Sequence, residues 1–170
     1  PGGVDLLAAP AETPERAFAD ASPVFTAKYD DVKDKIDAFK GELDAAVAGL
    51  ADDENWQSYL DTMSKFHRYS WTNQMLIHLQ TGGRATHVAG FRAWQDKFNR
   101  TVNKGEKAIG ILAPKTAWVP KKDPKTGEVI KGADGKPVKE KRVVGWTTAA
   151  VFDVAQTSGD PLPEIERELS

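Results

Sequence analysis

Aromatic and amide side chains are concentrated in one short stretch of the chain, residues 66–80. An aromatic ring can pack in a core or accept an unstacked base, and an amide can bond a backbone group or read a base edge. For Tyr69 and Trp71 the alternative to binding is a place in the core, and for Asn73 it is a buried structural amide. The side chains of this stretch that we place at or just beneath a binding surface are Arg68, Tyr69, Trp71, Asn73 and Gln74.

Further along the chain, tryptophans lie within a few residues of cations. Single-stranded nucleic acid is held by cations that track its phosphates and by ring faces that accept its bases, at about 1–3 kcal/mol per base. For Trp94 we favour packing in the core, although it remains a candidate. The candidate rings and cations in this part of the chain are Arg92, Trp94, Trp118, Lys121, Lys122, Lys141 and Arg142. Trp146 follows Lys141 and Arg142 in the sequence.

The net charge of -2 conceals a strong asymmetry along the chain. Residues 1–83 carry 7 basic and 14 acidic side chains, residues 84–142 carry 15 and 6, and residues 143–170 carry 1 and 5. A basic middle between acidic ends is a local footprint for a polyanion. For the lysine-rich residues 121–142, plain solvation is the alternative.

Several classes of protein are disfavoured. The 170 residues suit one domain, and no apolar run is long enough to span a membrane. Cysteine is absent, which excludes metal sites built from thiolates and is compatible with a reducing cytoplasm. We expect the protein to be cytoplasmic and monomeric. The three histidines are spaced by eleven and nine residues, and neither H-E-x-x-H, a phosphate loop nor G-x-S-x-G occurs. We therefore expect no catalytic activity, no metal and no cofactor.

Hydrophobic periodicity predicts the elements that position these residues. Apolar spacings of three and four predict helices over residues 26–50, 53–66 and 69–80, then a short one over 91–98. A strand over 108–113 should stop at Pro114, with residues 116–119 as its continuation, and 142–152 should return antiparallel to it. Residues 120–141 between them form either a hairpin arm or a disordered loop. The predicted fold is α+β, with N-terminal helices packed on a small antiparallel β-sheet that carries a long basic hairpin loop.

We divide the chain into a flexible leader (1–25), a domain (26–160) and an acidic tail (161–170). Four ordered motifs within residues 30 to 160 resemble the N-terminal domain of the ArdC antirestriction family, and also the N-terminal region of plasmid primases. The motifs are Tyr69-Ser70-Trp71-x-Asn73-Gln74-x-Leu76-Ile77, Ala85-Thr86-x-Val88-Ala89-Gly90-Phe91-x-x-Trp94, Arg100-x-Val102-x-Lys104-Gly105-Glu106-Lys107 and Phe152-Asp153-Val154-x-Gln156-Thr157.

The resemblance implies a domain that binds single-stranded DNA and that often precedes a zinc metalloprotease domain. Arg100, Lys104 and Lys107 of the third motif carry charges that suit phosphate contact, with simple solvation of a turn as the alternative. Asp153 and Gln156 of the fourth motif are expected to order a turn or a cap.

The expected function is non-sequence-specific binding of single-stranded DNA, as the DNA-binding part of a larger antirestriction or mobile-element protein of a plasmid or phage. A metalloprotease or primase domain would follow in the full-length protein. The alternative is a protein-interaction or targeting module for a separate enzymatic domain.

Overall fold

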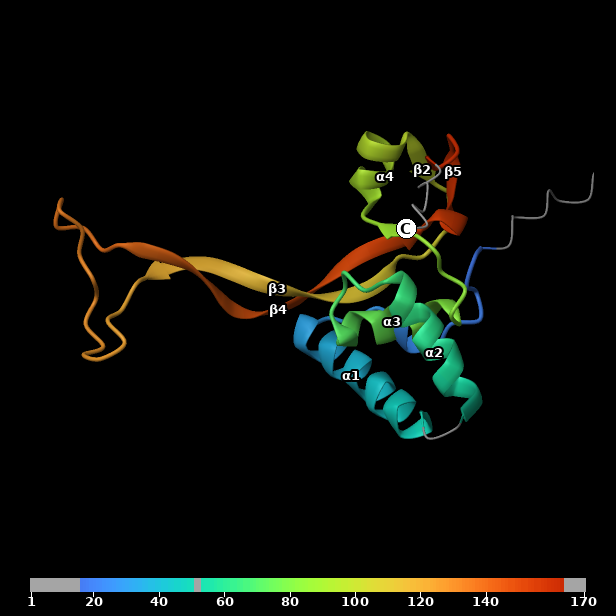
Figure 1. The fold of residues 1–170 in the computed structure, drawn as a ribbon, viewed down its shortest axis with the longest axis horizontal. Coiled ribbons are helices and arrows are strands. Elements are labelled where there is room, and N and C mark those ends of the chain that lie inside the picture. Colours follow the sequence, from blue (N-terminus) through green and yellow to red (C-terminus); the bar gives the residue numbers. More distant parts are fainter. Residues whose placement is uncertain (1–15, 51–52, 164–170) are drawn as a thin grey trace, which may run out of the picture.

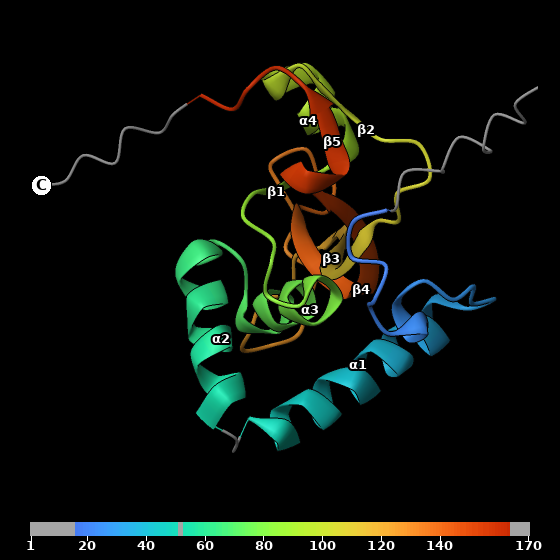
Figure 2. The same cartoon turned by 90° about the vertical axis from the view of Figure 1, so that its right-hand side faces the viewer.

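The computed structural model describes residues 16–50 and 53–163. It confirms the predicted α+β class: three helices pack beneath one end of a long antiparallel ribbon, and a smaller unit of one helix and two short strands lies on the other side (Figures 1 and 2). The elements are α1 (Val32–Gly49), α2 (Asp53–Lys65), α3 (Trp71–Thr81), β1 (Val88–Ala89), α4 (Phe91–Phe98), β2 (Arg100–Val102), β3 (Ile109–Pro120), β4 (Lys139–Asp153) and β5 (Thr157–Gly159), with 3-10 turns η1 (Pro23–Phe25) and η2 (Val154–Gln156).

Local capping sets the helix ends. α1 begins six residues later than predicted because the Asp31 carboxylate accepts a hydrogen bond from the Lys33 N–H (2.8 Å), which makes Asp31 the N-cap. α3 begins after Ser70, whose hydroxyl accepts the Asn73 N–H (3.2 Å), and ends at Gly82 in the left-handed conformation (φ 59°). α3 therefore begins two residues later and ends one residue later than the predicted range, residues 69–80.

Two small antiparallel sheets make up the β structure. One has the strand order β1-β4-β3, and the other pairs β2 with β5. The paired residues of β3 and β4 run from Ile109 opposite Val151 to Pro120 opposite Lys139. A β-bulge lies between Lys115 and Thr116. At about 3.3 Å per residue, the twelve residues of β3 span about 40 Å. Figure 1 shows that most of this ribbon projects beyond the helices. We call its projecting part, residues 114–146, the arm.

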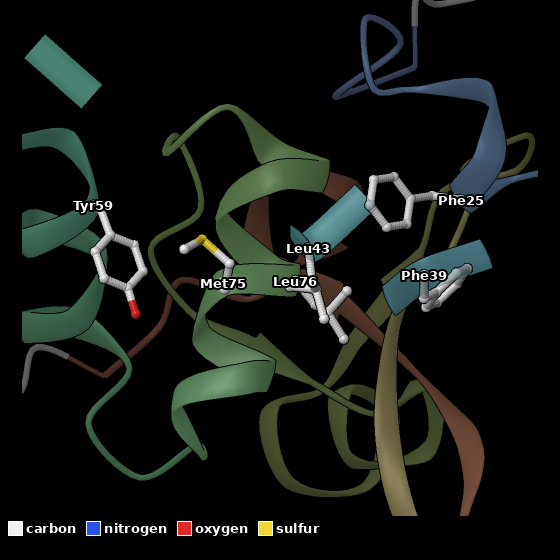
Figure 3. Close-up of a cluster of buried hydrophobic side chains, with 6 residues drawn as sticks. All are labelled: Phe25, Phe39, Leu43, Tyr59, Met75 and Leu76. Atoms are coloured by element: carbon white, nitrogen blue, oxygen red, sulfur yellow. The ribbon is translucent and has the colours of Figure 1, made fainter. Parts of the chain in front are cut away.

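The core has two clusters, and α3 contributes to both. Met75 and Leu76 of α3 pack in the first cluster, which Figure 3 shows between α2 and α1. Ile77, on the next position of the same helix, packs in the second cluster against the base of the ribbon, where Ile109 and Val151 are buried. α3 therefore connects α1 and α2 to the ribbon. We call α1, α2 and α3 the helical layer.

The leader and the tail lie partly outside the described residues, which exclude 1–15 and 164–170. Of the leader, residues 16–25 lie against the domain: Phe25 is buried in the first cluster, and the Ala17 N–H donates to Glu106 (2.9 Å). Within the described residues, no helix combines the length and the apolar character that crossing a bilayer requires.

Candidate nucleic-acid interface

Two amide side chains of α3 bond the outer edge of β3. The Asn73 amide donates to the Leu112 carbonyl and accepts from the Leu112 N–H (2.9 Å each). The Gln80 amide, two helical turns later, does the same with Gly110 (2.8 Å each) and also donates to the Leu76 carbonyl (2.9 Å). Each amide thus supplies the donor and the acceptor that a neighbouring strand would supply.

These bonds reveal which way the backbone of β3 faces. Because the N–H and C=O of Gly110 and Leu112 point away from β4, every second residue from Gly110 to Pro120 has its backbone groups on the outer edge. Pro114 falls in this series, so its missing N–H lies on the outer edge and breaks no ladder bond. The predicted break at Pro114 is therefore wrong, because β3 continues through it into residues 116–119, the predicted continuation.

The same register places two exposed tryptophans on one side of the arm. Trp146 lies opposite Pro114, and Trp118 lies opposite Lys141. Residues at alternate positions of a strand share a face, and directly opposed residues share it too. Trp118 and Trp146 therefore share a face, and their side chains are 67% and 59% exposed. The ladder positions of the two rings, four residues apart along β3, are separated by about 13 Å. We call this side the tryptophan face.

The arm is also the most basic part of the chain. Residues 115–142 carry nine lysines or arginines and four acidic side chains. Lys121, Lys122 and Lys141 are exposed, whereas Arg142 is exposed but pairs with Glu140 (2.6 Å). The tip is a hairpin, one of the two predicted alternatives, because the Lys121 N–H bonds the Val138 carbonyl (2.7 Å) and the Val138 N–H bonds Ile130 (2.9 Å).

The leading motif lies at the N-terminus of α3, mostly in structural roles. Like Asn73, Gln74 bonds backbone groups. Its side chain is buried and donates to the carbonyls of Phe66 (2.9 Å) and Tyr69 (3.1 Å). Tyr69 is half-buried, and burial raises the pKa of its hydroxyl. Arg68 is exposed, and Trp71 is 48% exposed with its ring edge-on to Tyr59. Of this set, only Arg68 and Trp71 offer an exposed side chain, while Asn73 and Gln74 have their amides occupied.

The second and third motifs support the smaller unit. Trp94 is 1% exposed, and its indole N–H donates to the Phe152 carbonyl (2.9 Å), which fastens α4 to β4. Arg92, on the same helix, is exposed. The Arg100 guanidinium donates to Thr157, Gly159 and Asp160 at 2.6–3.2 Å, and so joins β2 to β5. These contacts leave Trp94 no face for a base and occupy four of the five N–H donors of Arg100.

The remaining third-motif cations and the fourth motif lie at the base of the ribbon. Lys104 and Lys107 are exposed beside the turn that contains Gly105 (φ 88°). The buried Asp153 carboxylate accepts the N–H groups of Thr86 and His87 (2.8 and 3.0 Å). It also caps η2, where Gln156 completes a capping box, so these two residues order a turn as expected.

The structure therefore gathers only part of the predicted set. Five predicted residues lie together on the arm, while the others are divided among α3, α4 and the base of the ribbon. Sequence reasoning placed Trp146 close to cations but did not count it, or Lys139, among the site residues, although both lie on the tryptophan face. A hairpin register drawn from the period-two pattern of β3 and β4 would have found them. The predicted residues on the arm are Trp118, Lys121, Lys122, Lys141 and Arg142.

In the described part of the chain, no three acidic or histidine side chains gather where they could hold a metal ion. No curated protein and no solved structure matches the chain. The family model described as the N-terminal domain of anti-restriction factor ArdC matches residues 29–152, which include all of the helical layer and almost all of the ribbon. The match supports a role in antirestriction, and the chain belongs to the family of ArdC N-terminal domains.

Proposed function

We propose that this protein binds single-stranded DNA, with little sequence preference, through the tryptophan face of the arm. The observation that carries the proposal is the placement of Trp118 and Trp146 on one exposed face of the most basic segment of the chain. A base offers its flat face to an indole ring only when it is unstacked, as in a single strand. The proposal thus assigns the bases to the two rings and the phosphates to nearby lysines.

The chemistry of the arm accounts for weak sequence preference. Every base has a ring face, so stacking discriminates little among the four bases. The cations next to the rings, Lys139, Lys141, Lys121 and Lys122, contact phosphates as point charges and read no base edge. Because counterions are released when they do so, affinity should fall steeply as salt rises.

The test is fluorescence anisotropy of a labelled oligonucleotide with the whole chain at two salt concentrations. Trp118→Ala and Trp146→Ala should each weaken binding by about 5-fold to 150-fold, the equivalent of one stacked base. Trp56→Ala is the matched control, because Trp56 is 47% exposed but lies on α2. Binding that ignores salt, or arm variants that behave like Trp56→Ala, would overturn the proposal.

A further inference from the structure

The two edges of the arm differ in what they offer to another chain. On β3, four of the six outer positions are closed: the α3 amides occupy Gly110 and Leu112, and Pro114 and Pro120 have no N–H. Only Thr116 and Trp118 keep a free donor on that edge. This arrangement protects β3 from pairing with a further strand.

The edge of β4 has no such protection. Residues opposite the outer positions of β3 also point their backbone groups outward, because directly opposed residues form the same type of pair. These residues of β4 are Lys139, Lys141, Val143, Trp146 and Thr148. β1 pairs with β4 only at Phe152 and Asp153, and no other part of the described chain hydrogen bonds the edge between 139 and 148.

We propose that the outer edge of β4 between Lys139 and Thr148 is a docking site for an extended acidic segment of a partner protein, which pairs with β4 as an added strand. Every outward residue presents one N–H and one C=O, so the edge alternates donors and acceptors. A peptide backbone matches this alternation, whereas phosphates would meet the carbonyl oxygens as well as the amides. The chemistry of the edge therefore selects a polypeptide.

The charge of the edge selects an acidic one. Lys139 and Lys141 stand at adjacent outward positions, and both are exposed. Opposite charges on directly opposed positions stabilise a strand pair, and like charges destabilise it. The same repulsion disfavours pairing of β4 with β4 of a second copy. The added strand would lie beside the tryptophan face, so the proposal holds whether or not the face binds DNA.

The probe is a fluorescein-labelled nine-residue peptide in which glutamate alternates with threonine, titrated into the whole chain. Lys141→Pro removes an outward N–H without breaking a bond to β3, as Pro120 does on the facing strand. Lys141→Gln is its matched control, since it loses the same charge and keeps the N–H. We expect Lys141→Gln to weaken binding a few-fold and Lys141→Pro by about tenfold more.

Thr116→Pro provides a second control, because it removes an outward N–H from the opposite edge. It should leave peptide binding unchanged. In parallel, hydrogen exchange measures the arm directly: the peptide should protect the amides of Lys141, Val143 and Trp146 but not those of Thr116 and Trp118. Exchange in the wild-type chain does not depend on whether a variant folds.

Several results would overturn the proposal. One is an equal loss of peptide affinity in Lys141→Pro and Lys141→Gln, which would show that only the charge of Lys141 contributes to binding. Another is equal binding of a peptide with lysine in place of glutamate, or protection of both edges alike. A peptide-free dimer that Lys141→Pro dissociates would assign the edge to a second copy instead.

Discussion

Replacement of Gln80 should test whether the α3 amides hold the ribbon in register. Gln80→Met keeps the length of the side chain and its apolar stem but deletes the three hydrogen bonds of the amide. The N–H and C=O of Gly110 then lose their partners in a buried site, at about 1–3 kcal/mol for each group. Because methionine fills most of the volume, the cavity contribution is small. We expect a loss of about 2–6 kcal/mol of unfolding free energy, a large fraction of what a domain of this size has.

Urea denaturation, followed by far-ultraviolet circular dichroism, measures this loss if the m-value stays constant. Gln57→Met is the matched control: Gln57 lies on the exposed side of α2 and makes one long bond to Asp61 (3.4 Å), so its replacement should change stability by less than about 0.5 kcal/mol. Asn73→Leu should fall between the two, at about 1–2 kcal/mol, because the bonds of Asn73 to Leu112 are only part-buried and water can replace them. If Gln80→Met is no more destabilising than Gln57→Met, the amides do not hold the ribbon.

Two other perturbations probe the base of the ribbon and the helical layer. A Cβ at Gly110 would lie 2.7 and 2.9 Å from two ring carbons of Phe39. Gly110→Ala should therefore lower the unfolding free energy by about 1–3 kcal/mol, and adding Phe39→Leu should recover part of this loss. Gly41→Ala, within α1 and with nothing near its Cβ, should instead leave the unfolding free energy unchanged or raise it in the same urea denaturation experiment. Equal effects at the two glycines would refute the clash. Burial lowers the pKa of His78, whose Nδ1 lies 2.8 Å from the Thr62 hydroxyl. The unfolded chain therefore takes up a proton at His78 more readily than the folded chain does. The unfolding free energy should fall as the pH drops below 6.5, the ordinary pKa of histidine in the unfolded chain. The urea midpoint at pH 7.5 and pH 5.5 measures this fall, and a His78→Gln variant with the wild-type pH dependence would exclude His78 as its source.

The sequence predicted the helices well because their caps and apolar spacings are local signals, as at Ser70 and Gly82. It failed at Pro114 because a proline ends a strand or not according to whether its nitrogen faces a partner strand, which is a tertiary property. The same applies to Arg100: its charge suggested phosphate contact, and only the pairing of β2 with β5 shows the carbonyls that its guanidinium bonds. Local pattern identifies a side chain that can do chemistry, but the long-range register decides which groups reach it.

The register also connects the leading motif to the arm. A two-stranded ribbon is marginally stable by itself, and a slip of one residue along β3 would move Trp118 to the opposite face from Trp146. Asn73 and Gln80 each bond one residue of β3, and so fix the strand against the helical layer at two points. The amides of α3 then contribute to the tryptophan face without touching a ligand. A variant such as Asn73→Leu should therefore reduce nucleic-acid affinity only as far as it loosens the ribbon, with the salt dependence of binding unchanged.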